Sequence, residues 1–342
     1  LGTDDFGWGP NNRFKFPLRG GTGAFYDRIA RHIGVRGAGG GSGVATSDGH
    51  IELNRRVVSI DVDQRIARFA DGSSEKYDVL ISAMPVDVLC RDVLTGGGAG
   101  ATPASVPEEI RRTAARLRHS AGFMVGIGIK RPCPSTKSWM YFPEANCPFY
   151  RVTYLSNYSP FMTPDKDRYY SLLCETSQSE FKPVDESRIV EETIRGLENA
   201  GLLEPGERED IVTTWVYHAD YSYPTPSVDR DEVLARVIPW LEGRNIYSRG
   251  RFGMWKYEVS NTDHTLMQGV EVVNRLVLGE RETTIGIVYA ATEDGRQAAM
   301  HERSAVAGSG EKRAAQVEAK PAVGDQKEAD IAEEELGVTQ KE

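Results

Sequence analysis

Cysteine, basic charge and long apolar runs are all scarce in this 342-residue sequence. The 4 cysteines are scattered without a C-x-x-C pair, which excludes a recognisable disulfide framework or zinc site. No apolar run reaches the roughly 18 residues that a membrane-spanning helix needs. The 50 acidic residues outnumber the 41 basic ones, and the net charge of −9 disfavours nucleic acid and anionic membranes as partners. We therefore expect a cytoplasmic protein that binds neither.

The two ends of the sequence also lack features of a complete globular chain. The sequence starts at Leu1, without the charged and apolar regions of a signal peptide, and we interpret it as a fragment missing its N-terminus. Residues 295–342 contain no aromatic residue and are rich in Ala, Glu and Lys. Because such a composition buries little apolar surface, we expect residues 281–342 to be mostly disordered.

Alternating and periodic apolar residues indicate strands and helices in a mixed order. Loops separate the expected strands, and the expected helices are set to one side of them. This arrangement predicts a largely antiparallel sheet with flanking helices. Glycine-rich stretches at 38–43 and 95–105 are interpreted as flexible connections. A helix of about three turns is expected within 20–34, and further helices are expected at about 107–118, 186–200 and 229–242. The expected strands include 76–85, 121–130, 139–142, 150–154, 169–175 and 212–218.

A further helix is predicted near the end of the informative sequence. Leu266, Val270, Val273 and Val277 recur at helical spacing and mark one face. Asn261 or Asp263 could cap this helix, and Gly279 could end it. Glycines and arginines precede its N-terminus, which makes the helix start a natural place for an anion or an electron-rich ring edge.

Arg151 is the first candidate binding residue. The stretch YFPEANCPFYRVTYLSNYSP, residues 141–160, contains this one cation among aromatic rings and amides, with no carboxylate after Glu144. The hydroxyls of neighbouring tyrosines and the guanidinium fork could converge on a phosphate, and no acid close in sequence competes for the charge. The alternative is a strand arginine that stacks on tyrosines and reaches water.

Arg249 and Arg251 in SRGRFGMWKY are the second candidates. The glycines beside them would let the backbone approach a ligand, and Trp255 and Tyr257 offer a ring surface and a hydroxyl. A β-turn with solvated arginines explains the pattern equally well.

The sequence shows no obvious nucleophile, metal cluster or acid pair. Its histidines have neither metal-ligand spacing nor a G-x-S-x-G serine nearby. If the protein is an enzyme, its reactive atom is therefore expected to come from a cofactor.

Several stretches together resemble one family, the eukaryotic-type UDP-galactopyranose mutases. They are GWGPNNRFKFPLRGGTG, DGSSEKYDVLISAMPVDVL, WMYFPEANCPFYRVTYLSNYSP, DYSYPTPS and RGRFGMWKYEVSNTDHTLMQGVEVVN, in the order of the family and over roughly residues 6–280. The second and the last are shared by the wider flavin amine-oxidase-like group, whereas the third and fourth are more specific to the mutases.

The resemblance implies an α/β fold with an FAD-binding Rossmann-like domain and an antiparallel-sheet substrate domain. We expect a partial FAD domain with a substrate loop at 1–90, the sheet domain at 91–245 and a return to the FAD domain at 246–280. The implied reaction is the interconversion of UDP-galactopyranose and UDP-galactofuranose through an adduct of the sugar with N5 of the reduced flavin, without a protein nucleophile. NAD(P)H is a possible reductant.

The resemblance also implies roles for single residues. Arg151 and Tyr158 would contact the diphosphate, with Trp139 and Tyr141 beside the sugar and nucleotide. Tyr223 and Tyr257 match phosphate-binding tyrosines. Further substrate contacts are implied for Lys15 and Asn261, and cofactor contacts for Gly21, Arg251, Gly253, Asn261 and Thr262.

Two departures from the family pattern affect this assignment. Lys15 stands where the family usually has arginine, so the charge is kept but the bidentate fork is lost, and the second diphosphate clamp could be Lys15, Arg13 or Arg19. The G-x-G-x-x-G segment expected to bind the FAD pyrophosphate is absent from the sequence. The alternatives are an FAD-dependent amine-oxidase-like oxidoreductase and an inactive fragment.

Overall fold

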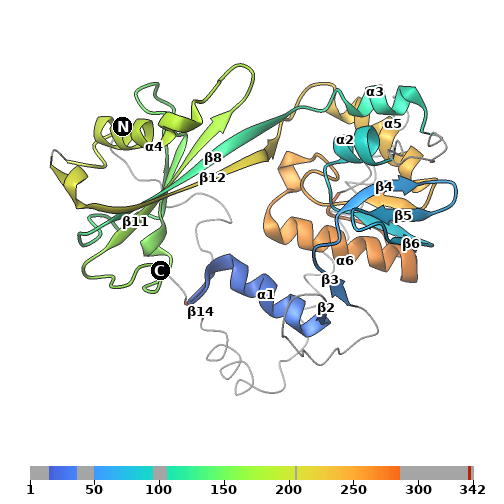
Figure 1. Cartoon of the computed structure of the whole chain (residues 1–342), viewed down its shortest axis with the longest axis horizontal. Coiled ribbons are helices and arrows are strands. Elements are labelled where there is room, and N and C mark those ends of the chain that lie inside the picture. The colour runs from blue at the N-terminus through green and yellow to red at the C-terminus, as the bar shows by residue number, and fades with distance from the viewer. Residues whose placement is uncertain (1–14, 37–49, 95–105, 205, 286–337, 340–342) are drawn as a thin grey trace, which may run out of the picture. The chain divides into compact units, whose positions relative to one another are not determined.

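The computed structural model describes residues 15–36, 50–94, 106–204, 206–285 and 338–339 (Figure 1). The chain divides into two compact units. Unit 1 comprises Leu1–Leu53, Ala121–Ser222 and Val323–Glu342, and unit 2 comprises Asn54–Ser120 and Tyr223–Ala322. These bounds differ from the ones expected after residues 90 and 245, and the assignment of a flavin domain and a substrate domain stays a prediction. The connections predicted at 38–43 and 95–105 and most of the predicted tail lie outside the described residues.

An antiparallel sheet forms the centre of unit 1. Its strand order is β12-β8-β11-β10-β9, and the pairs of β8 with β11, β11 with β10 and β10 with β9 are antiparallel. The sheet agrees with the strands predicted from alternation. The strands are β8 (His119–Ile129), β9 (Trp139–Tyr141), β10 (Arg151–Tyr154), β11 (Tyr170–Gln178) and β12 (Ile211–Pro224).

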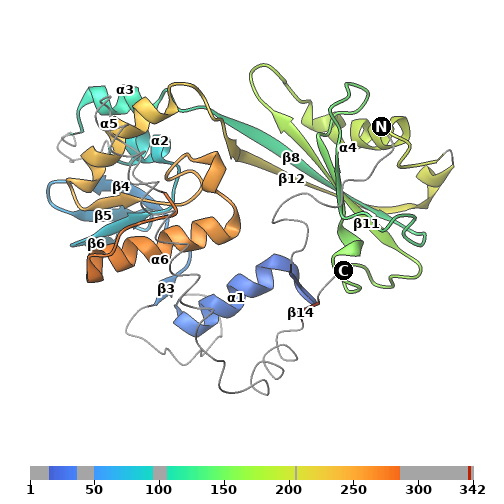
Figure 2. The same cartoon turned by 180° about the vertical axis from the view of Figure 1, so that it is seen from behind.

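One face of this sheet carries the core of unit 1. Alternate residues of β8, such as Phe123 and Val125, are buried and pack with Leu197 of helix α4 (Ile189–Asn199). Figures 1 and 2 show α4 beside the sheet from both sides. The intervening β8 positions include Gly128, where an added Cβ would lie only 2.5 Å from the Thr213 side chain of β12, so the absence of a side chain lets β12 approach closely. The second face therefore differs in chemistry from the apolar first face.

The remaining helix and short strands of unit 1 come from the N-terminal part of the chain, together with β14 near its C-terminal end. Helix α1 (Gly21–Ile33) ends at Gly34 as the sequence predicted. Gly20 precedes it at φ 77°, in the left-handed region that glycine adopts without strain. Short strands flank this helix: β1 (Phe16–Pro17) pairs with β14 (Val338–Thr339), and β2 (Val35–Arg36) pairs with β3 (Ile51–Glu52).

Unit 2 combines two small sheets with helices. Strands β4 (Val57–Asp61), β5 (Ile66–Phe69) and β6 (Ser74–Lys76) form an antiparallel ribbon, and β7 (Leu80–Ser82) pairs in parallel with β13 (Ile246–Ser248). The helix predicted at 107–118 is shorter, because Pro107 is its N-cap and the last turn is irregular. The helices are α2 (Val86–Val88), which continues as a π-helical turn to Val93, α3 (Glu108–Ala114), α5 (Arg230–Glu242) and α6 (Thr262–Leu278).

Helix α6 buries polar residues and exposes apolar ones. Asn261 is its N-cap and Gly279 its left-handed C-cap, as predicted. Its buried side chains are Gln268, Glu271 and Val272, whereas the apolar face recognised in the sequence is exposed. Its exposed apolar residues are Leu266, Met267, Val270, Val273, Val277 and Leu278.

Candidate functional site

Arg151 lies on the face of the unit 1 sheet opposite the apolar core. It occupies the first position of β10, where the register places it between Tyr141 of β9 and Glu175 of β11. The next residue, Val152, is fully buried in the core. Because successive side chains of a strand point to opposite faces, Arg151 and Glu175 share the other face.

Glu175 forms a bidentate ion pair with Arg151. The guanidinium donates from Nε to Oε1 and from Nη2 to Oε2, both at 2.7 Å. The expectation that no acid competes for Arg151 is therefore wrong, because an acid 24 residues downstream lies directly opposite it on the neighbouring strand. Sequence reasoning missed Glu175, although it is the one charged residue in β11, and a buried charge in an apolar strand signals a partner.

Tyr158 belongs to the same cluster. It follows a 3-10 turn at Leu155–Asn157, and its ring meets Phe16 edge to face with centroids 5.1 Å apart. Burial raises the pKa of Tyr158 to about 12, although the nearby charge of Arg151 acts in the opposite direction. The hydroxyl thus remains protonated at neutral pH and can donate a hydrogen bond to an anion.

The segment that contains Lys15 packs on the turn that follows Tyr158. The Ser159 hydroxyl donates to the carbonyl oxygen of Leu18, and the Arg19 guanidinium lies 3.4 Å from the centre of the Phe161 ring. Lys15 is exposed immediately before Phe16, whose ring contacts Tyr158. Among the described candidates for a second clamp, Arg19 is thus held by an aromatic ring; Arg13 lies outside the described residues.

Other predicted residues of unit 1 have simpler surroundings. Trp139 of β9 pairs with Thr153 of β10, and Tyr141, two residues further along β9, is exposed. Gly21 begins α1 at φ 63°, and no atom outside its own chain neighbourhood lies within 4 Å of a Cβ added there. Its predicted cofactor contact stays a prediction.

A second cluster forms in unit 2 around Arg251. Its guanidinium lies 5.0 Å from the centre of the Tyr223 ring, and Nε donates to the carbonyl oxygen of Ser260 at 3.0 Å. The Tyr223 and Tyr257 rings are 5.9 Å apart. Three residues that the resemblance selected from distant stretches are therefore neighbours within this unit.

Gln268 fixes the loop that carries this cluster. Its Oε1 accepts from the Gly250 N–H at 2.8 Å, and its Nε2 donates to the Val259 carbonyl oxygen at 2.9 Å. Gly253 is required within the same loop, because a Cβ there would lie 2.1 Å from the carbonyl oxygen of Arg249. The loop is thereby held against the first half of α6.

Arg249 and Trp255 serve the core of unit 2 instead of a surface site. Arg249 is 2% exposed and pairs with Glu282 at 2.6 Å and Glu242 at 2.8 Å, so the picture of solvated arginines in a turn is wrong for it. Trp255 is fully buried and donates its indole N–H to the carbonyl oxygen of Arg118 at 2.9 Å. Glu282 lies 33 residues from Arg249 and Arg118 lies 137 residues from Trp255, which explains why the local pattern did not reveal these contacts.

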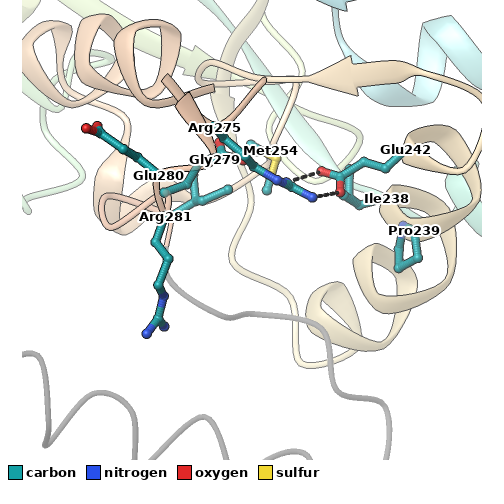
Figure 3. Close-up of a pocket in the computed structure, with 10 residues that line it drawn as sticks. Ile238, Pro239, Glu242, Met254, Arg275, Gly279, Glu280 and Arg281 are labelled. Carbon is teal, nitrogen blue, oxygen red and sulfur yellow. Dashed lines mark hydrogen bonds and ion pairs between the residues drawn. The ribbon is translucent and has the colours of Figure 1, made fainter. Parts of the chain in front are cut away.

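A cavity of about 430 Å³ lies beside this ion-pair network (Figure 3). In Figure 3, Arg275 of α6 reaches Glu242 at the end of α5, and their closest bond is 2.9 Å. Met254 and Ile285 also line the cavity, but none of the predicted substrate or cofactor residues does.

The start of α6 partly fits the edge of a flavin ring. Its first N–H groups receive no side-chain cap from Asn261, and Nδ1 of His264 is buried without a partner among the described residues. Backbone N–H groups and the positive end of the helix dipole favour an electron-rich edge. Asn261 and Thr262 are therefore suitably placed, whereas the described residues include no glycine fingerprint for the pyrophosphate.

Other classes of site are not found in the described part of the chain. No group of three or more His, Cys, Asp or Glu residues there could hold a metal ion. No helix among the described residues is long and apolar enough to cross a membrane.

Comparison with known proteins supports the fold. The chain is similar to a protein described as reduced UDP-galactopyranose mutase, with a TM-score of 0.71 and 38% identity over 82% of this chain and 56% of that chain. A putative protoporphyrinogen oxidase from Exiguobacterium sp. 255-15 shares the fold at 13% identity, with a TM-score of 0.50 over 68% of this chain and 48% of that chain. This chain thus spans little more than half the length of the first structure.

A family model matches most of the sequence. The family described as flavin containing amine oxidoreductase matches residues 4–301, and the predicted mixed α/β fold with an antiparallel sheet is confirmed. Members of this family use FAD, which agrees with the predicted cofactor. Because the match covers most of the sequence, the chain belongs to the flavin-containing amine oxidoreductase family.

Proposed function

We propose that the protein is a UDP-galactopyranose mutase, which interconverts UDP-galactopyranose and UDP-galactofuranose. The observation that carries this proposal is the cluster of Arg151, Tyr141 and Tyr158 at the sheet face opposite the apolar core, in the stretch that most resembles the mutases. The 38% identity to a mutase structure supports it. A hydrophobic-amine oxidase would instead need an apolar cage.

The roles follow from the chemistry of the groups. Arg151 provides a charged fork and Tyr158 a hydroxyl donor for the diphosphate, with Trp139 and Tyr141 beside the sugar and nucleotide. The resemblance also implies that Tyr223 and Tyr257 contact phosphate. Charge-assisted hydrogen bonds of this kind stabilise UDP as the leaving group when its bond to the sugar breaks.

The cofactor would be held from unit 2. Arg251, Gly253, Asn261 and Thr262 form the loop and helix start that fit the flavin edge, and Gly21 is a further contact implied by the resemblance. Reduced FAD, when bound, supplies the nucleophile for the anomeric carbon. NAD(P)H is the proposed source of the electrons that reduce it.

An anaerobic assay tests this function. The 342-residue chain would be incubated with FAD, dithionite and UDP-galactofuranose, while chromatography follows UDP-galactopyranose and absorbance follows bound flavin. Conversion with bound flavin is the expected result. Bound flavin without conversion would instead favour an amine-oxidase-like oxidoreductase, and the absence of both would identify an inactive fragment.

A further inference from the structure

Three side-chain hydrogen bonds hold the Glu175 carboxylate on the sheet face that carries Arg151. It accepts hydrogen bonds from Nε and Nη2 of Arg151 at 2.7 Å each, and its Oε2 also accepts from the Tyr150 hydroxyl at 2.8 Å. The Tyr150 backbone N–H donates to the Glu175 carbonyl oxygen at 2.9 Å. Side chain and backbone together therefore fix Glu175 relative to the start of β10.

The pair is asymmetric in its exposure. The Glu175 side chain is 7% exposed, whereas the Arg151 side chain is 27% exposed. The carboxylate is thus the buried anchor, and the guanidinium is the end that reaches the surface. The guanidinium is therefore the partner of this ion pair that a ligand in solvent can reach.

The edge of the Arg151 guanidinium that bonds Glu175 fixes the direction in which the opposite edge points. Because Nε and Nη2 face Glu175, the rigid planar fork directs Nη1 away from the carboxylate. Without this bidentate ion pair, rotation about the bonds of the Arg151 side chain would change both the plane and the direction of the guanidinium group. An anion site requires its donors in a fixed arrangement before the ligand arrives.

We infer that Glu175, supported by Tyr150, is a positioning residue that orients Arg151 toward the diphosphate of a nucleotide ligand. This inference rests on the proposed function and adds to it a residue that does not touch the substrate. It makes a prediction opposite to simple charge counting. Glu175→Gln raises the net charge of the cluster by one, which by Coulomb attraction alone would strengthen the binding of an anion; loss of the orientation weakens it instead.

The test is titration calorimetry of the 342-residue chain with UDP and with uridine. Glu175→Gln should weaken UDP binding about tenfold, on the scale of one charge-assisted hydrogen bond, and leave uridine binding unchanged. Tyr150→Phe keeps the ion pair and should weaken UDP binding by about two- to threefold. In the Arg151→Ala background, Glu175→Gln should cause no further loss, because there is no guanidinium to orient.

Three results would overturn the inference. Unchanged UDP affinity in Glu175→Gln would show that the carboxylate does not orient Arg151. Tighter UDP binding would show that the carboxylate competes with the ligand for Arg151. An equal loss of affinity for UDP and for uridine would indicate a structural role. If Glu175→Gln fails to fold, Tyr150→Phe provides the same comparison of the two affinities. UDP binding that depends on Arg151 but not on Glu175 overturns this inference alone, whereas failure of the unsubstituted chain to bind UDP overturns the proposed function with it.

Discussion

Arg249 and Glu282 form a buried ion pair across 33 residues of sequence. Nε of Arg249 lies 2.6 Å from Oε2 of Glu282, and their side chains are only 3% and 4% exposed. Glu282 also accepts from Arg275 at 2.8 Å, so this network joins the end of α6 to the segment that follows it. Its consequences for stability can be measured without any ligand.

Removal of one partner should destabilise unit 2. We expect Arg249→Met to lower the free energy of unfolding by up to about 3–5 kcal/mol, because it removes the buried counter-ion of Glu282 and leaves Arg275 as the remaining partner of that carboxylate and of Glu242. Urea denaturation followed by tryptophan fluorescence measures the change. The matched control is Arg112→Met, whose ion pair with Glu108 is exposed and should contribute less than about 1 kcal/mol. Equal effects of the two substitutions would contradict the structural role of burial.

The same network predicts a dependence on acid. Burial acts to raise the pKa of Glu282, but hydrogen bonds from Arg249 and Arg275 and their charges outweigh it and hold the pKa below its ordinary value of 4.5. The carboxylate therefore contributes stability that is fully present above the unfolded-state pKa and is lost as pH falls through the folded-state pKa. Denaturation midpoints between pH 7 and pH 3 should fall less steeply for Glu282→Gln than for the unsubstituted chain. Parallel curves would exclude Glu282 as a contributor.

Arg151→Ala should weaken UDP binding by about one to two powers of ten, because it removes charge-assisted hydrogen bonds that contribute about 1.5–3 kcal/mol each. Titration calorimetry gives the affinity. Arg168→Ala is the control, since Arg168 is an exposed arginine of the same unit whose guanidinium packs on Tyr169. An unchanged affinity in Arg151→Ala would remove this residue from the binding site.

Two glycines of the loop before α6 should respond differently to alanine. Gly253→Ala places a Cβ against the Arg249 backbone, so we expect a loss of about 1–3 kcal/mol or more. Gly250→Ala has open space but a φ of 92°, and the strain should cost about 1–2 kcal/mol. Thermal unfolding monitored by circular dichroism would rank the two, and the opposite order would show that the loop relaxes around residue 253.

The buried cysteines should resist alkylation in the folded protein. Burial raises the pKa of the Cys90 thiol to about 12, and it raises the pKa of Cys174 further above its ordinary value. Because the thiolate is the reactive form, iodoacetamide at pH 8 should modify neither until the chain unfolds. Mass spectrometry of peptides from native and urea-treated protein would locate the labels. Rapid native labelling of Cys90 would reveal local opening of unit 2.

Local patterns predicted the elements well and the partners of charged residues poorly. Alternation was sufficient for β8 and β11, and the caps Asn261 and Gly279 delimit α6 as expected. The ion pair of Arg151 could not be predicted because strand register, a tertiary property, brings Glu175 opposite it. Composition drew attention to Arg151, but only the fold shows which group holds it.

Long-range contacts also explain why a site residue and a core residue look alike in sequence. Arg249 and Arg251 are separated by one glycine, yet the first is buried by Glu242 and Glu282, and the second lies over Tyr223. No periodicity distinguishes them, because the difference depends on two acids and a ring that lie outside this short stretch. The resemblance selected Arg251 and left Arg249 open, and the structure separates the two.

The exposed apolar face of α6 has a practical consequence for handling the protein. Leu266, Val270 and Val277 are 49%, 45% and 73% exposed, so solvent meets a stripe of hydrocarbon along the helix. Such a stripe favours adsorption to plastic and to air–water interfaces, and it should bind hydrophobic dyes in the native state. Sulfate strengthens the burial of apolar surface, so losses from dilute solutions should increase in ammonium sulfate and decrease with mild detergent.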